Sequence, residues 1–346
     1  MSDLKSTSRI KYIGFLRVLS ALAVVFLHVN NCFWMFSDEL YWKQANVIES
    51  VFYFAVPVFF MICGPTNLNY RDKYSTKEYL MKRFNKTVIP FLAWSVIAIV
   101  YRVLSHDIDV ANISAGLILK GVVESSFIKI YWFFWALFGI YLMIPLFSLV
   151  PKDKRVNIYS YIILVIFIFD ILPSFILNIT DFSVELPVTF GPEIKYIAYV
   201  LLGYVLNEID LKIVNRLLIY CVSLIGLIAH ALGTYLLSIM SGEIVGVYKG
   251  YDNIPCFFYS IGVFVFVKYF AKRISSDSFW HFIDYVGGYT FSVYLIHIYI
   301  WYIMLRLGVD GRSLLIRIIM PFLIMGMSMT IVWVVRKIPI VRRIVP

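Results

Sequence analysis

The sequence predicts an all-α fold, a polytopic transmembrane bundle of about ten helices that forms a single membrane-embedded domain over residues 1–346. Composition is the first reason: 61% of the residues are hydrophobic and 15% are charged, whereas soluble domains carry about 45–50% apolar and about 25% charged residues. The second is that the apolar residues form runs near the roughly 20 residues that a helix needs to cross the hydrocarbon. Membrane lipid is therefore the expected surrounding of this chain.

The apolar runs also predict where the individual helices lie. Most of them approach the length of a membrane-spanning helix, and the sixth is distinctly short. No long polar stretch remains that would form a separate domain. The predicted spans are 12–36, 47–66, 88–104, 130–150, 158–177, 194–206, 217–240, 254–270, 285–305 and 314–335.

Lysine and arginine predict the orientation of the bundle, because they accumulate in cytoplasmic loops. With the N-terminus inside, the cytoplasmic loops hold roughly twice as many of these residues as the opposite loops. Both termini are therefore expected in the cytoplasm. The net charge of +10 follows from this bias and is spread over short loops. Because no folded module gathers this charge, no nucleic-acid partner is expected.

Arg17 and His28 are ionisable residues in the first span, where a charge costs about 2.5–3.5 kcal/mol and usually marks a functional site. They are 11 residues apart, so they share one helix face and lie about 16 Å apart along its axis. The topology places Arg17 near the cytoplasmic leaflet and His28 past the midplane. Imidazole accepts a proton at neutral pH. The arrangement therefore favours a reaction in which His28 is the base and the donor molecule enters from the cytoplasm. In the structural alternative, Arg17 binds headgroups and His28 bonds a neighbouring helix.

Other ionisable residues interrupt later spans. His297 lies at or past the midplane, where it would face His28 or else serve only a helix–helix hydrogen bond. Asp170 would orient a histidine or bind a polar acceptor; alternatively, it begins a loop if the fifth span ends early. Three further ionisable residues lie within or near spans: His230, for which a structural role is favoured, Glu193 and Lys195.

A basic segment ahead of the third span, Lys82-Arg83-x-x-Lys86, is predicted at the cytoplasmic surface. It would either anchor the helix there or grip a polyphosphate, since arginine offers paired hydrogen bonds and lysine a point charge. The sequence contains no phosphate-binding glycine loop, no dinucleotide fingerprint and no HExxH motif. Its four cysteines form no CxxC pair. We therefore expect no permanently bound cofactor and no metal ion.

Four blocks of this sequence resemble acyltransferase family three, the bacterial integral-membrane O-acyltransferases. The resemblance runs from about Ile10 to Val335, and the blocks occur in the family's order. The most specific block is an arginine followed, after ten residues, by a histidine. The blocks are Phe15-Leu16-Arg17 with His28, Val56-Pro57-Val58-Phe59-Phe60-Met61-Ile62-Cys63-Gly64, Trp132-Phe133-Phe134-Trp135-Ala136-Leu137 running to Tyr141, and Ser292-Val293-Tyr294-Leu295-Ile296-His297.

The resemblance implies a reaction: transfer of an acyl group from cytoplasmic acyl-CoA, with acetyl-CoA the expected donor substrate, to a sugar hydroxyl. The acceptor would be a glycan or glycolipid, such as a surface polysaccharide, lipopolysaccharide or a lipid-linked precursor. By the same resemblance His28 is the catalytic base, Arg17 helps to hold the donor, and the family's Arg-x-x-Arg pair corresponds to Arg83 and Lys86. The expected location is the bacterial cytoplasmic (inner) membrane, in a multi-pass topology.

The chain also departs from the family pattern. Lys86 replaces the second arginine, which keeps the charge but gives up one bidentate contact. The chain resembles the compact subgroup without an extra periplasmic domain, since no domain is expected after Pro346. The other departures are Gly14 where many members have aspartate, Ile130 where many have histidine, Cys63 in place of serine, and Ala136 with Leu137 where some have an acidic residue.

These residues predict a mechanism in which His28 removes the proton of an acceptor hydroxyl as it attacks the thioester. His297 and Asp170 would position the acceptor or stabilise the imidazolium. Tyr131 and Trp132 would offer stacking surfaces to a sugar, unless they are ordinary interface aromatics. In a variant mechanism, His28 itself carries the acyl group. Two other classes stay open: an exporter of a polysaccharide intermediate, and a scaffold in a synthesis complex.

Overall fold

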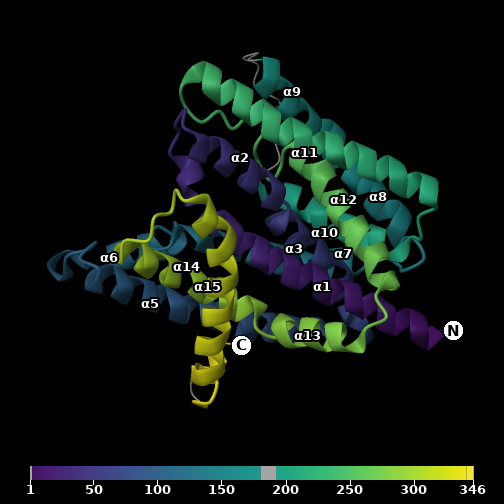
Figure 1. Ribbon diagram of the computed structural model, residues 1–346. Helices are drawn as coiled ribbons and strands as arrows, with labels where there is room; N and C mark the ends of the chain where they lie inside the picture. The colour runs from purple at the N-terminus through teal and green to yellow at the C-terminus, as the bar shows by residue number, and fades with distance from the viewer. Residues whose placement is uncertain (1, 181–191, 340, 346) are drawn as a thin grey trace. The chain divides into compact units, whose positions relative to one another are not determined.

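The computed structural model describes residues 2–180, 192–339 and 341–345, with side chains described for residues 11–180, 195–339 and 341–345. Glu193 therefore lies outside the described side chains. The regular structure in this part of the chain is helical throughout (Figure 1). It contains eight helical segments long and apolar enough to cross a membrane, or up to nine if one bent pair counts as a span. The predicted all-α, multi-pass membrane fold is confirmed, while the number of spans and the cytoplasmic termini stay predictions.

The chain divides into two compact units. Unit 1 comprises Met1–Asn67 and Val150–Thr330, and unit 2 comprises Leu68–Leu149 and Ile331–Pro346. Helix α15 (Leu314–Val335) begins in unit 1 and ends in unit 2. The single acyltransferase domain over residues 1–346 stays a prediction.

Helix α1 (Ser2–Val29) is the central helix of unit 1. Leu16 and Ala23 on this helix are fully buried. An ionisable side chain in a membrane is tolerated where protein surrounds it, and α1 offers such a place. The helices that contact α1 are α2 (Leu40–Phe52), α3 (Ala55–Asn67), α12 (Ile254–Phe270), α13 (Asp277–Gly287) and α14 (Thr290–Arg306). Helix α11 (Ile213–Ser241) lies along α12 (Figure 1) and also contacts α2.

Helix α10 (Pro192–Glu208) corresponds to the short sixth predicted span and has 17 residues. It packs against α3 and α8 (Arg155–Ile166). Helices α3 and α10 meet backbone to backbone, since a Cβ on Gly64 would overlap the backbone of Val200 and one on Gly203 would overlap that of Met61. Small residues permit this close approach between membrane helices. With 17 residues, α10 is as long as α12 and α14, and so longer than the predicted span.

Asp170 lies inside a helical segment and not at the start of a loop. The segment runs from α8 through a π-helical turn, Phe167–Ile171, into α9 (Leu172–Thr180). Pro173 follows the turn, and because proline has no N–H, the regular α-helical hydrogen bond to residue 169 is missing there. The helix accommodates this loss with a wider turn, a feature that is frequent at functional sites.

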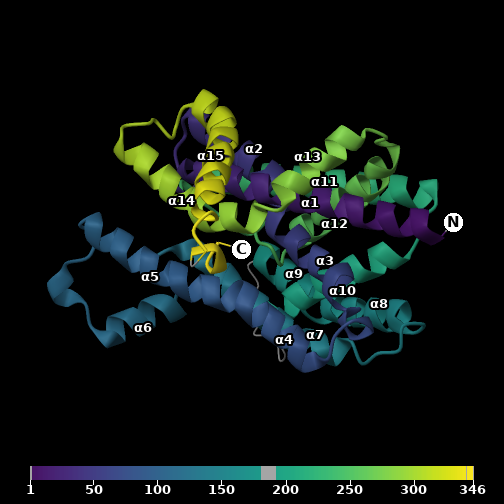
Figure 2. The same cartoon turned by 90° about the horizontal axis from the view of Figure 1, so that it is seen from below.

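Unit 2 begins with a long helical segment over residues 76–104. Ser75 caps α4 (Thr76–Arg83): its Oγ accepts the N–H of Glu78, and its own N–H donates to the Glu78 carboxylate over 2.7 Å. This reciprocal capping box satisfies N–H groups that the first turn of a helix leaves unpaired. A π-helical turn, Phe84–Val88, leads into α5 (Ile89–Leu104), and α6 (Ala115–Val123) returns beside α5 (Figure 2).

Aromatic rings form the core of unit 2. Phe91 of α5 contacts Tyr131 and Phe134, with ring centroids 6.3 Å and 5.1 Å apart. Phe134 belongs to α7 (Trp132–Phe147). The C-terminal residues join this packing: the indole N–H of Trp94 donates to the carbonyl of Ile344 over 2.9 Å, and Nε of Arg336 donates to that of Val345 over 3.0 Å.

Candidate active site

His28 and His297 form a hydrogen-bonded pair inside unit 1. Nδ1 of His28, near the end of α1, lies 2.7 Å from Nε2 of His297 on α14. Their ring centroids are 4.9 Å apart, and the ring planes differ by 26°. His297 is 1% exposed, whereas His28 is half-buried. The expectation that the two histidines face each other is confirmed.

The hydrogen bonds of the pair determine which nitrogen of His28 is available as a base. Nδ1 of His297 lies 2.9 Å from the carbonyl oxygen of Val293, one turn earlier on α14. A carbonyl oxygen only accepts, so Nδ1 of His297 carries the proton and Nε2 of the neutral ring has a lone pair. That lone pair accepts the Nδ1 proton of His28, which leaves Nε2 of His28 unprotonated. His28 thus has a lone pair on Nε2, while its Nδ1 is bonded to the ring of His297.

Arg17 lies on the same α1 helix as His28, as its spacing predicts, and is half-buried. No break interrupts the helix over Lys11–Val29, so the two side chains keep the separation of about 16 Å expected from the helical rise. The role of Arg17 in holding a donor stays a prediction.

Asp170 belongs to a row of alternating charges in unit 1. Nζ of Lys195, on α10, lies 3.5 Å from Oδ1 of Asp170 and 3.1 Å from Oδ2 of Asp252. Ser174 Oγ donates to Oδ1 of Asp170 over 3.3 Å. Asp170 is fully buried, and its partners among the described residues are Lys195 and Ser174. Asp170 thus joins α9 to α10, and Lys195 extends the row to the loop before α12. The predicted role of Asp170 beside a histidine or an acceptor stays a prediction.

A second polar group, which the sequence did not single out, begins two residues after His28. Nη1 of Arg317 donates to Oδ1 of Asn30 over 3.2 Å, and Nδ2 of Asn30 donates to Oε2 of Glu49 over 3.2 Å. Arg317 and Asn30 are fully buried, and Glu49 is 2% exposed. The sequence signal was available: Asn46, Glu49, Ser50 and Tyr53 recur at helical spacing in an apolar span. This network holds the end of α1 against α2 and α15.

Lys249, in the loop between α11 and α12, lies close to this network. Its ammonium group lies 4.2 Å from the ring centroid of Phe33 and 4.6 Å from that of Tyr53. These distances are typical of cation–π contacts. Lys249 is 7% exposed, and its Nζ has no hydrogen-bond partner within the described part of the chain. Burial lowers the pKa of Lys249 to about 8, although the nearby Glu49 carboxylate acts in the opposite direction.

We expect thermal stability to rise between pH 7 and pH 9 through Lys249. Because its pKa is about 8 in the folded protein and about 10.4 in an unfolded chain, the unfolded state binds more protons over the interval between these values. The free energy of unfolding then increases with pH. Lys249→Met should remove this increase, as measured by melting temperature in detergent at both pH values. Lys43→Met, an exposed control on α2, should keep it; equal slopes in all three proteins would contradict the assignment.

The basic segment Lys82-Arg83-x-x-Lys86 is brought together in unit 2 at the junction of α4 and the π-helical turn. The Arg83 guanidinium lies 5.4 Å from the ring centroids of both Tyr79 and Tyr141. Its Nε is buried and has no hydrogen-bond partner among the described residues. Lys86 and Lys82 are exposed. The segment thus combines an arginine beside two aromatic rings with the exposed Lys86, while the Lys82 ammonium group lies 3.1 Å from the ring centroid of Tyr74.

The two predicted aromatic sugar-binding residues, Tyr131 and Trp132, occupy different environments in unit 2. Tyr131 is 2% exposed, and its ring packs against Phe91 and Phe134. Trp132 is 36% exposed. Of the two, Trp132 offers the more accessible ring, and sugar stacking on either residue stays a prediction.

The fold and the histidine pair define a class: an all-helical, multi-pass membrane protein with a hydrogen-bonded pair of histidines inside the bundle. The family model described as an acyltransferase domain, that of acyltransferase family three, matches residues 10–337. The chain therefore belongs to this family of membrane acyltransferases, and the resemblance deduced from the four sequence blocks is confirmed. No curated protein and no solved structure matches the chain.

Proposed function

We propose that the protein is a membrane-bound O-acyltransferase of a bacterial inner membrane. It transfers an acyl group, acetyl in the first instance, from cytoplasmic acyl-CoA to a sugar hydroxyl of a cell-surface polysaccharide or its lipid-linked precursor. The observation that carries this proposal is the His28–His297 pair, because it leaves Nε2 of His28 unprotonated inside a bundle that belongs to an acyltransferase family.

The proposed reaction needs one base. Nε2 of His28 takes the proton of the acceptor hydroxyl as the oxygen attacks the thioester carbonyl. The carbon–sulfur bond then breaks, and the CoA thiolate leaves and receives the proton from His28. While His28 is an imidazolium, Nε2 of His297 continues to accept its Nδ1 proton, which stabilises the charge. In the covalent variant, Nε2 of His28 attacks the thioester and the CoA thiolate leaves; the hydroxyl then takes the acyl group from Nε2, and its proton passes to the thiolate.

We propose that Arg83 and Lys86 bind the phosphates of the donor. Arg83 offers a fork of N–H donors held between two tyrosine rings, and such groups suit phosphate oxygens. Arg17 would contribute a further positive charge along α1. No resident cofactor or metal is part of this proposal, because acyl-CoA is consumed as a substrate.

Arg83→Ala is expected to raise the KM for acetyl-CoA by about 10–100-fold, because a charged hydrogen-bonded contact is lost. Lys86→Ala should raise it less, and Lys86→Arg, which restores the family's pair, should lower it. The measurement is initial rate against acetyl-CoA concentration with purified protein in liposomes. Lys129→Ala, which removes an exposed lysine from the same unit, serves as the control. An unchanged donor KM in Arg83→Ala would exclude a phosphate contact.

The function itself is tested by separating transfer from transport. Mass spectrometry of surface glycans from cells with and without the protein should reveal the mass of one acyl group on a sugar. Proteoliposomes supplied with acetyl-CoA should then acylate the isolated glycan. Glycan flux across the liposome membrane without acetyl-CoA, together with no change in glycan mass, would instead identify an exporter.

A further inference from the structure

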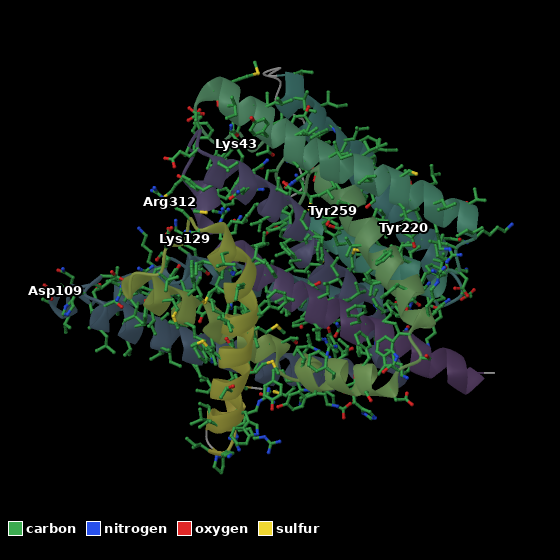
Figure 3. All side chains as sticks on the ribbon, in the orientation of Figure 1. Lys43, Asp109, Lys129, Tyr220, Tyr259 and Arg312 are labelled. Carbon is green, nitrogen blue, oxygen red and sulfur yellow. The ribbon has the colours of Figure 1, made fainter. Side chains whose placement is uncertain are left out.

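A pocket of about 210 Å³ lies in unit 1, between the end of α1 and the loop that joins α14 to α15. Val29 and Asn31 contribute to its lining from the end of α1 and the turn after it, and Trp301 and Gly311 contribute from α14 and the loop that follows. Asp310 and Arg312 are the charged residues of the lining. Figure 3 shows Arg312 at the turn before α15, at the same end of unit 1 as Lys43 of α2.

The pocket is adjacent to the histidine pair along both helices that supply it. Val29 is the residue after His28, and Trp301 is four residues after His297. Four residues correspond to about one helical turn, or about 6 Å along the axis, and place both side chains on the same face of α14. A molecule in this pocket would therefore lie within about one turn of the base.

The lining combines apolar side chains, Met35, Leu305 and Val309 among them, with groups that form hydrogen bonds. Trp301 is 2% exposed, and its indole N–H has no hydrogen-bond partner among the described residues. Asp310 accepts the backbone N–H of Arg312 over 2.9 Å with Oδ1, so its other oxygen can accept a further bond. Asn31 adds an amide, which both donates and accepts. Sugar hydroxyls also donate and accept, and sugar rings present C–H faces to aromatic rings.

The size and charge of the pocket further restrict which molecule can occupy it. The volume of about 210 Å³ is below the roughly 300–1,000 Å³ of pockets that enclose drug-sized ligands, so it suits a single ring rather than a whole acyl-CoA. The lining contains one acidic and one basic residue, Asp310 and Arg312, and their charges cancel. An uncharged sugar therefore fits better than a polyphosphate or an acidic sugar.

We propose that this pocket is the acceptor subsite, which binds one uncharged sugar ring and brings its hydroxyl to His28; this inference rests on the proposed acyltransferase function. Asp310 and Asn31 would bind hydroxyls, and the apolar lining residues would contact the C–H faces of the sugar ring. These residues would thus determine which sugars are acylated, while the donor is bound elsewhere.

Gly311 allows the pocket to be narrowed without removing any of these groups. A Cβ at Gly311 would lie 3.4 Å from the Trp301 ring, so Gly311→Val fills space beside the ring, and Gly311→Ala fills less. Gly326→Val is the matched control, because a Cβ there meets nothing within 4 Å. The probes are octyl β-D-glucoside, octyl β-D-galactoside and octyl N-acetyl-β-D-glucosaminide, below their micellar concentrations, with octyl β-D-glucuronide as the acidic counterpart.

With acetyl-CoA as donor, the wild type should acylate at least one neutral glycoside in preference to the glucuronide. Gly311→Val should raise the KM for that glycoside at least about tenfold, Gly311→Ala should raise it less, and both should keep the donor KM and melting temperature. Asp310→Asn, which retains an oxygen for the Arg312 N–H, should raise the acceptor KM by about 10-fold.

Equal acceptor KM values in Gly311→Val and Gly326→Val would overturn the assignment of the subsite. A preference of the wild type for the glucuronide would also overturn it, as would a Gly311→Val variant in which only the donor KM rises. Acylation of the native glycan without turnover of any neutral glycoside would also overturn it, while the proposed function would stand. A protein that acylates no glycan at all would contradict the function itself.

Discussion

His28→Ala is expected to lower kcat for acyl transfer by about 10²–10⁴-fold, which is the contribution of a positioned general base. The same loss is expected if His28 carries the acyl group. The measurement is transfer of radiolabelled acetyl from acetyl-CoA to the isolated glycan in liposomes. The melting temperature of the variant measures how much stability is lost when Nε2 of the buried His297 loses its partner.

The matched control is His281→Ala, which removes an exposed histidine from α13. This variant should retain full activity. Near-normal transfer by His28→Ala would exclude the proposed mechanism. Rapid quenching of the wild type with radiolabelled donor and no acceptor separates the two chemical routes: label on His28 supports the acyl-histidine, and its absence supports direct attack by the hydroxyl.

His297→Leu is expected to lower kcat by about 10–100-fold with little change in the donor KM. Leucine fills much of the space of the buried ring but offers no lone pair to the Nδ1 proton of His28. The imidazole of His28 would then lose the bond that orients it, together with the group that stabilises its charged form. Rates at saturating donor and acceptor give kcat, and the dependence on donor concentration gives KM.

His297→Gln distinguishes this positioning role from mere packing. The glutamine side-chain oxygen can accept the Nδ1 proton of His28, so this variant should retain more activity than His297→Leu. Equal losses in the two variants, or a loss that appears only in KM, would mean that His297 supports the fold of α14 and not the base. Melting temperatures of both variants show whether packing has been disturbed.

The histidine pair could be predicted because the sequence indicates how deep in the membrane each histidine lies. Hydropathy places both histidines in spans, and the positive-inside rule places both at or past the midplane. The sequence alone therefore indicates that the two side chains could meet. The Asn30–Glu49–Arg317 network could not be found that way. Its members lie on α2, on α15 and directly after α1, so only the packing of these helices brings them together.

The sequence by itself determined the fold class, the membrane setting, the family and the candidate base, because these depend on local composition, periodicity and motif spacing. Only the tertiary structure decided which nitrogen of His28 is available, since this depends on a carbonyl of α14 that orients a second ring. It also decided that Asp170 pairs with Lys195 and that Trp301 lines a pocket one turn from the pair. Such contacts join residues distant in the chain, and their partners are set by how the helices pack, which no local pattern encodes.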